Sequence, residues 1–199
     1  MTMDQKLYEA VSARLGSRKG AHDMSHLLRV RETALRIAES ENADVDVVEA
    51  MAMLHDLVRY EDYREEDSVE ETLIEARKIL EELNYDKKQI EEILDGISSH
   101  SLHSKIYKTP RTIEAKILFD ADKIDSVGEI GIARWFMTVG GRDISVAEAA
   151  SIYLNTLNKQ QKKMKGRMYT DLGNKLIKEK AYFTKKFLEN CIAAAKLPE

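Results

Sequence analysis

The sequence has very little cysteine, proline or glycine, with one, two and nine of them among 199 residues. The single cysteine, Cys191, can form no disulfide within the chain and cannot build a cysteine-based metal site. No stretch is long and apolar enough to span a bilayer, and the first residues lack the apolar core of a signal peptide. We therefore expect a cytoplasmic protein with no membrane partner.

The chain also has no excess of positive charge. The chain has 31 Lys and Arg residues against 35 Asp and Glu residues, which gives a formal net charge of −4 at pH 7. Proteins that read nucleic-acid sequences present a strongly basic surface. A lysine-rich segment such as 160–165 is interpreted as a solvated helix face, so we expect no sequence-specific nucleic-acid partner.

The residues that are abundant favour helices. Ala, Leu, Ile, Glu and Lys are frequent, and the hydrophobic content of 43% is enough for a sizeable core. We predict an all-α protein with a single domain, residues 1–199, made of a core at about 20–139 and C-terminal helices at about 145–195. The apolar periodicity predicts helices at about 4–15, 23–41, 45–57, 68–83, 86–99, 111–127, 132–139, 145–165 and 170–195.

The pair His55-Asp56 is the most informative feature of the chain, because it lies near the end of an apolar run that begins at Val47. Asp44 is the expected N-cap of the helix that carries this run. Two polar side chains buried there without partners would destabilise the fold. A divalent metal ion would satisfy both of them.

Other histidines and aspartates lie on either side of this pair. His22 and His26 are four residues apart, so they share a helix face if the helix begins early enough. Asp122 and Asp125 are three residues apart on another apolar helix. The two aspartates either form a capping or ion-pair arrangement with Lys123 and Arg134 or are metal ligands, and the residues alone leave both readings open.

Taken together, these residues make a mixed nitrogen and oxygen ligand set from three helices within the 20–139 core: His26, His55, Asp56 and Asp122. Imidazole with carboxylate suits first-row transition metals, whereas an all-oxygen site suits Mg or Ca. The expected cofactor is a divalent metal, with Mn, Co, Ni, Fe, Zn and Mg as candidates.

Several motifs resemble the HD superfamily of metal-dependent phosphohydrolases. They are His-x-x-Arg-Val at 26–30, Met-Leu-His-Asp-Leu at 53–57 and Ala-Asp-Lys-Ile-Asp at 121–125. The chain is most similar to small bacterial and archaeal HD proteins, some of which are nucleoside triphosphate pyrophosphohydrolases, and the resemblance extends over about 20–192. It implies an HD-domain helical bundle with the metal at its middle, held by the four residues named above.

The departures from the family pattern are also informative. Residues 57–59 read Leu-Val-Arg in place of the Ile-Gly-Lys of many HD phosphodiesterases, and no Gly-Tyr-Pro motif occurs. These differences argue against a cyclic-dinucleotide phosphodiesterase.

The polar segments at 58–67 and 98–109 are expected to border the site. In the first of them, Glu61 and Asp62 are the predicted catalytic residues, which would position the attacking water as acidic loop residues do in some nucleotidases of the family. The predicted substrate-binding residues, which would contact phosphate, are Arg29, Arg59, His100, Lys123 and Arg134.

The leading hypothesis is a metal-dependent phosphohydrolase acting on a nucleotide or another small phosphate ester, with pyrophosphate release from a (deoxy)nucleoside triphosphate as the preferred reaction. An HD-fold di-iron oxygenase is the second hypothesis, because His100 and His103 could supply further ligands. The third is a non-catalytic helical interaction module whose metal is structural. The apolar C-terminal helix leaves room for a homodimer.

Overall fold

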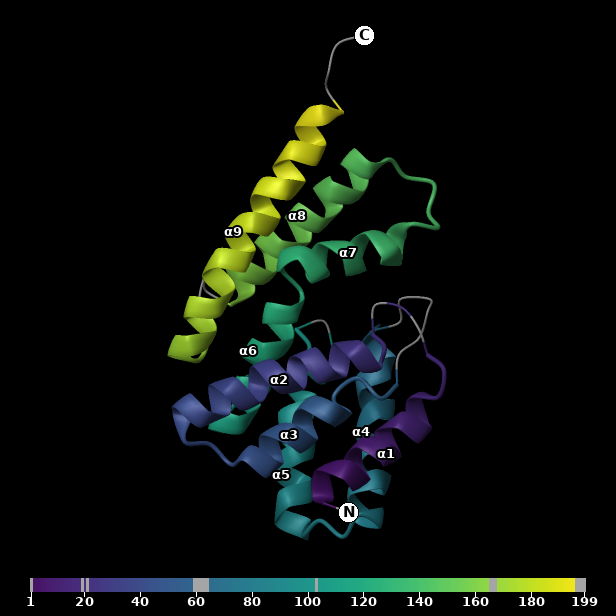
Figure 1. Ribbon diagram of the computed structural model, residues 1–199, viewed down its shortest axis with the longest axis vertical. Helices are drawn as coiled ribbons and strands as arrows, with labels where there is room; N and C mark the ends of the chain where they lie inside the picture. The colour runs from purple at the N-terminus through teal and green to yellow at the C-terminus, as the bar shows by residue number, and fades with distance from the viewer. Residues whose placement is uncertain are drawn as a thin grey trace. The chain divides into compact units, whose positions relative to one another are not determined.

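The computed structural model describes residues 2–18, 20, 22–58, 65–102, 104–164 and 168–195, and every regular element in these ranges is an α-helix (Figure 1). The all-α prediction is therefore confirmed. The helices of the described residues are α1 (Met3–Leu15), α2 (Met24–Glu41), α3 (Val45–Leu54), α4 (Glu65–Glu82), α5 (Lys87–Ser98), α6 (Ile113–Asp125), α7 (Gly128–Val139), α8 (Val146–Lys163) and α9 (Asp171–Ala194). None of them is long and apolar enough to cross a membrane.

Side-chain caps explain where several helices begin. Asp44, the predicted N-cap of α3, accepts hydrogen bonds from the backbone N–H groups of Asp46 and Val47. Asp23 caps α2 in the same way, through the backbone N–H of His26. These bonds satisfy N–H groups that have no partner inside the helix.

The end of α3 differs from the prediction. The expected helix continued to 57, whereas α3 ends at Leu54, so that His55 and Asp56 lie in the turn that follows. The backbone carbonyls of Asp56 and Leu57 accept hydrogen bonds from the Arg18 guanidinium, which gives them a partner outside any helix.

The start of α7 also differs from the prediction. We expected Gly128 and Gly131 to loosen the chain before a helix at 132, but α7 begins at Gly128, whose φ of +80° favours glycine. A Cβ atom at Gly131 would lie 2.4 Å from the Ser126 carbonyl, so glycine lets the helix start directly against this backbone.

The chain divides into two compact units, Met1–Asp122 and Lys123–Glu199. In the first unit α3 packs against α1, α2 and α5, while α4 packs against α5 and α1. Its core contains large, fully buried side chains from each of these helices, including Leu7, Leu27, Met51, Leu80 and Ile93. The single-domain organisation stays a prediction.

The second unit is built on the pairing of α8 with α9, which lie side by side (Figure 1), and α7 packs against both. Its core includes Ile132, Ala150, Tyr153 and Leu188, with the Trp135 ring stacked on Tyr153 at a centroid distance of 5.0 Å.

Candidate metal centre

His26 is placed by the start of α2. It lies in the first turn of the helix, where its backbone N–H is bonded to the carboxylate of the N-cap Asp23, and its side chain is fully buried. The cap therefore fixes the point on the chain from which the imidazole enters the interior.

His55 is held by a hydrogen bond to its own helix end. Its Nδ1 atom lies 2.8 Å from the carbonyl oxygen of Ala52, so Nδ1 carries the proton and the lone pair is on Nε2. Within the described part of the chain, this buried Nε2 atom makes no hydrogen bond. An imidazole nitrogen in that situation is a natural metal ligand, since ligating histidines usually donate their other N–H to a carbonyl or a carboxylate.

Two carboxylates face these imidazoles. Asp56 Oδ2 lies 3.5 Å from His26 Nε2 and 3.9 Å from His55 Nε2. Asp122 Oδ1, from the last turn of α6, lies 3.8 Å and 3.9 Å from the same two nitrogens. Atoms bound to one first-row metal ion at about 2.0–2.2 Å are themselves about 3–4 Å apart, so these spacings fit a shared ion.

The protonation state of His55 also suits a metal. Burial lowers the pKa of its imidazole, because removal from water disfavours the charged form, and the nearby Asp56 and Asp122 only partly oppose this effect. The imidazole is therefore neutral at pH 7, the form that coordinates metals.

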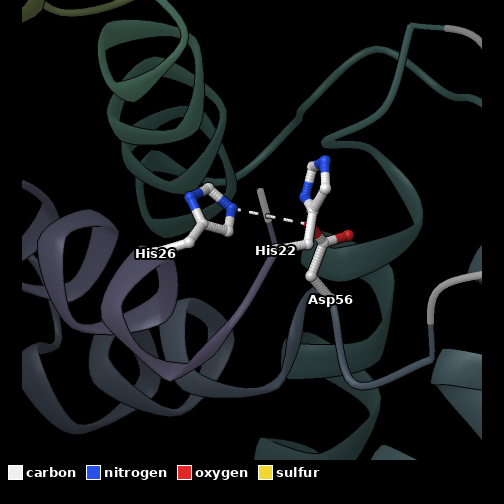
Figure 2. A group of neighbouring side chains, drawn as sticks. All are labelled: His22, His26 and Asp56. Atoms are coloured by element: carbon white, nitrogen blue, oxygen red, sulfur yellow. Dashed lines mark hydrogen bonds and ion pairs between the residues drawn. The ribbon is translucent and has the colours of Figure 1, made fainter. Parts of the chain in front are cut away.

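Two further histidines adjoin the same carboxylate. His100 is buried, its Nδ1 lies 2.6 Å from the carbonyl oxygen of Ile97, and its Nε2 lies 3.9 Å from Asp56 Oδ1. His22 Nδ1 lies 2.7 Å from Asp56 Oδ2, and Figure 2 shows the His22 and His26 imidazoles converging on this carboxylate. The ligand atoms lie within 4.8 Å of one another in each of three overlapping groups: His22, His26, Asp56; His26, His55, Asp122; and His55, Asp56, His100.

The model of the HD domain family matches residues 24–127, just over half of the chain, and this range contains His26, His55, Asp56 and Asp122. The chain belongs to the HD domain family. HD domains bind divalent metals, and the groups of His and Asp described above could hold one.

A bacterial relative resembles this chain along most of its length. The YpgQ protein of Bacillus subtilis (strain 168) is 31% identical over 181 residues, which cover 89% of this chain and 86% of YpgQ. The crystal structure of YpgQ in complex with ADP is 27% identical in sequence, covers 98% of this chain and 95% of YpgQ, and has a TM-score of 0.73.

Two structures of HD superfamily hydrolases are also similar. A predicted HD superfamily hydrolase from an uncultured Thermotogales bacterium is 26% identical, with 96% of this chain and 91% of that chain covered and a TM-score of 0.66. An HD-superfamily hydrolase from Bacillus thuringiensis is 25% identical, with 99% and 100% covered and a TM-score of 0.68. Membership of the HD family, together with these neighbours, supports hydrolysis as the general activity.

The structure brings together all four predicted metal ligands and places His22 beside them. The sequence put His22 on the His26 face only if the helix began early enough, and did not include it in the ligand set. Its role as a neighbour of Asp56 could not be read from helical spacing, because His22 precedes the helix. His100, predicted to contact substrate, also lies in the cluster.

The remaining predicted site residues either are not members of the His and Asp groups described above or lie outside the described residues. The Arg29 guanidinium donates a hydrogen bond to the Ser25 hydroxyl at 3.0 Å, on the exposed side of α2. Arg134, in the second unit, pairs with Asp125 at 2.5 Å, which is the ion-pair reading left open for that aspartate. Lys123 is buried and also belongs to the second unit. Arg59, Glu61, Asp62 and His103 fall outside the described residues, and their roles stay predictions.

Proposed function

We propose that this HD domain protein is a metal-dependent phosphohydrolase whose substrate is a nucleotide, and that it releases pyrophosphate from a (deoxy)nucleoside triphosphate. The observation that carries the proposal is the buried Nε2 atom of His55, which has no hydrogen bond among the described residues and lies 3.9 Å from an oxygen of each of two carboxylates. A cation is the species that satisfies a neutral nitrogen and two carboxylates together.

The residues proposed to hold the ion are His26, His55, Asp56 and Asp122. Such an ion, when bound, lowers the pKa of water and polarises a phosphoryl oxygen. The Ala52 carbonyl keeps the His55 tautomer with its lone pair on Nε2. Glu61 and Asp62 are proposed to orient the attacking water.

A nucleotide substrate is supported by a relative. YpgQ has been crystallised in complex with ADP, and that structure covers 98% of this chain. Arg29, Arg59, His100, Lys123 and Arg134 are proposed to contact the phosphates. Pyrophosphate release rests on the resemblance to small HD pyrophosphohydrolases.

A second function has one observation in its favour. His100 presents Nε2 toward Asp56 Oδ1, so a third group of ligand atoms adjoins the first. If this site held two iron ions, an HD-fold di-iron oxygenase would be the better assignment than a hydrolase. Iron bound by the purified protein, with oxygen consumption that depends on an added substrate, would support this reading against hydrolysis.

The test is a hydrolysis assay on protein loaded with Mn²⁺ or Co²⁺. A panel of ribo- and deoxyribonucleotides and simple phosphate esters is incubated with it, and phosphate and pyrophosphate are detected separately. We expect pyrophosphate from triphosphates, and we expect Asp122→Asn to reduce the rate by more than about 100-fold through loss of the metal.

Asp95→Asn is the matched control, because Asp95 is a surface carboxylate that pairs with Arg111 outside the cluster. This variant should retain the wild-type rate. Full activity in Asp122→Asn, or no product from any member of the panel, would rule out the proposed function.

A further inference from the structure

Asp56 is the carboxylate at the centre of the histidine cluster, yet no helix holds it. Its two oxygens lie within 4 Å of a nitrogen of four histidines, which are His22, His26, His55 and His100. Because α3 ends at Leu54, Asp56 follows the helix in a turn, where intrahelical hydrogen bonds do not define the backbone. Something else must therefore fix where this carboxylate points.

Arg18 fixes the backbone of the turn. Its Nη1 donates to the carbonyl oxygen of Asp56 at 3.0 Å, and its Nη2 donates to the carbonyl oxygen of Leu57 at 2.7 Å. A planar guanidinium that donates to two consecutive carbonyls restricts both peptide groups at once. A positive charge is also favourable beyond the C-terminal end of a helix such as α3.

His22 fixes the side chain of the same residue. Its Nδ1 lies 2.7 Å from Asp56 Oδ2, closer than any of the three other imidazoles. An ionised carboxylate only accepts hydrogen bonds, so the imidazole donates. Figure 2 shows His22 beside the Asp56 carboxylate, across from His26.

Both residues come from one short connection between α1 and α2. Gly16 has φ +56° and Gly20 has φ +115°, backbone conformations that residues with side chains rarely adopt. Gly16 and Gly20 therefore permit turns of the backbone that other residues would disfavour. His22 and Arg18 also precede residue 24, where the match to the HD domain begins.

We propose that Arg18 and His22 together position Asp56 for metal binding, Arg18 through the backbone and His22 through the carboxylate. The inference rests on the proposed metal site. Neither residue is assigned a contact with substrate or with the reacting atoms. Arg18 and His22 thus hold the turn that carries Asp56 in place.

Two other roles for these residues predict different results. His22 could itself be a metal ligand, since its ligand atom groups with those of His26 and Asp56. Arg18 could bind substrate phosphate, since it is a half-buried cation. His22→Asn keeps a hydrogen-bond donor but removes the imidazole ligand. A phosphate contact by Arg18 would not alter Mn²⁺ affinity measured without substrate, so the two measurements separate these possibilities.

The experiment measures Mn²⁺ affinity by calorimetry and by the electron paramagnetic resonance signal of free Mn²⁺, on the full chain and without substrate. The variants are Arg18→Ala, Arg18→Lys, His22→Ala and His22→Asn. We expect both alanine variants to bind Mn²⁺ about 10–100-fold more weakly, the usual effect of losing a residue that orients a ligand. His22→Asn places an amide donor near the position of Nδ1 and should recover most of the affinity, and Arg18→Lys should recover part of it.

Arg14→Ala is the matched control. Arg14 is also a cation near the end of α1, but its guanidinium pairs with Glu75 on α4. It should bind Mn²⁺ as the wild type does. Circular dichroism and thermal melting of each metal-free variant show whether it is folded before its affinity is compared.

Three results would overturn the proposal. The first is affinity within about twofold of wild type in both folded alanine variants. The second is a Mn²⁺ affinity of His22→Asn as low as that of His22→Ala, which would make His22 a metal ligand. The third is Arg18→Ala with unchanged Mn²⁺ affinity and, in the hydrolysis assay described above, a raised KM, which would make Arg18 a phosphate contact.

Failure of the proposed function gives a different pattern. A wild type that binds Mn²⁺ but hydrolyses nothing would remove the phosphohydrolase assignment and leave the positioning of Asp56 testable by affinity alone. A wild type that binds no Mn²⁺ would overturn both.

Discussion

Two glutamates in the first unit have opposite pKa shifts because their surroundings differ. Burial raises the pKa of Glu49 on α3, although the Arg31 guanidinium pairs with its carboxylate and opposes the shift. The pKa of Glu75 on α4 is lowered, first by the hydrogen bond from Lys78 Nζ at 2.8 Å and then by Arg14. The two residues should therefore respond to pH in opposite senses.

In the wild type, Glu49 should make the free energy of unfolding fall as pH rises, and we expect Glu49→Gln to reduce this fall. A carboxyl whose pKa is raised by folding binds more protons in the folded than in the unfolded chain. Its contribution is therefore fully present below the ordinary value of 4.5 and declines as pH rises through the folded pKa. Each unit of difference corresponds to about 1.4 kcal/mol. Urea unfolding at a series of pH values between about 4 and 8 should show a smaller decline for Glu49→Gln than for the wild type.

Glu75→Gln is the control, because its effect on the pH dependence of stability should have the opposite sign. With its pKa lowered, Glu75 contributes stability above 4.5 that is lost as pH falls through the folded pKa, so this variant should flatten the acid side of the profile. A Glu49→Gln profile parallel to that of the wild type would contradict the assignment.

Single residues also show what the sequence could reveal about the site. His55 and Asp56 stand out because polar groups in an apolar run need partners, and the family motif adds His26 and Asp122. The contact between His22 and Asp56 could not be predicted, because it depends on the path of the chain through Gly16 and Gly20, which no periodic pattern records.

At the scale of helices, α3 shows a start that could be predicted and an end that could not. Asp44 is recognisable as an N-cap from its side chain and its position before an apolar run. The end of α3 has no such signal, since the hydrogen bonds from Arg18 that occupy the next carbonyls come from a distant part of the chain. Long-range contacts of this kind are invisible to local propensity.

Two glycines within helices should respond differently to alanine. A Cβ at Gly131 would meet the backbone carbonyl of Ser126 at 2.4 Å, whereas a Cβ at Gly96 would meet the flexible end of the Met51 side chain at 2.4 and 2.5 Å. Alanine favours a helix by about 1 kcal/mol over glycine, and overpacking costs about 1–3 kcal/mol when the neighbour cannot move.

We therefore expect Gly131→Ala to lower the free energy of unfolding and Gly96→Ala to change it little, because the thioether of Met51 can rotate away. Urea unfolding of the two variants beside the wild type checks the order. Greater destabilisation by Gly96→Ala than by Gly131→Ala would contradict it.

The start of α7 is tied to α9 by one side chain. The Thr184 hydroxyl accepts a hydrogen bond from the backbone N–H of Gly128 at 2.7 Å and donates to the carbonyl oxygen of Lys180 at 2.8 Å. Thr184→Val keeps the shape but leaves a buried N–H without its acceptor, which costs about 1–3 kcal/mol. We expect that loss in urea unfolding.

Thr156→Val on α8 is the matched control, because the Thr156 hydroxyl also donates to a carbonyl four residues earlier, that of Ile152. Thr156 is partly exposed, and among the described residues no backbone N–H donates to its hydroxyl. It should change stability by less than Thr184→Val. Equal effects of the two variants would mean that the bond to Gly128 contributes nothing.

For the whole molecule, composition was sufficient to predict an all-α chain, but not its division. The boundary between Asp122 and Lys123 falls inside α6, where no proline, glycine or polar linker marks it. The predicted break at about 139–145 followed the glycines after α7. Packing between distant helices defines the compact units, and local sequence does not contain that information.

All of the proposed metal ligands belong to the first unit, on α2, the turn after α3 and α6. An ion bound there would connect three segments that are far apart along the chain. Binding to the folded state alone stabilises it by about 2.7 kcal/mol when the free metal is 100 times its Kd. Because α8 and α9 contribute none of these ligands, the stabilisation should be local to the first unit if the two units open separately.

Hydrogen exchange followed by mass spectrometry, with and without saturating Mn²⁺, measures where this stabilisation falls. We expect slower exchange in peptides from α2, from the end of α3 and from α6, and unchanged exchange in peptides from α8 and α9. His55→Ala should abolish the difference everywhere, because it removes the ligand whose buried nitrogen supports the site. Equal slowing in α8 and α9 would mean that the two units unfold together as one cooperative structure, and no slowing in α6 would remove Asp122 from the ligand set.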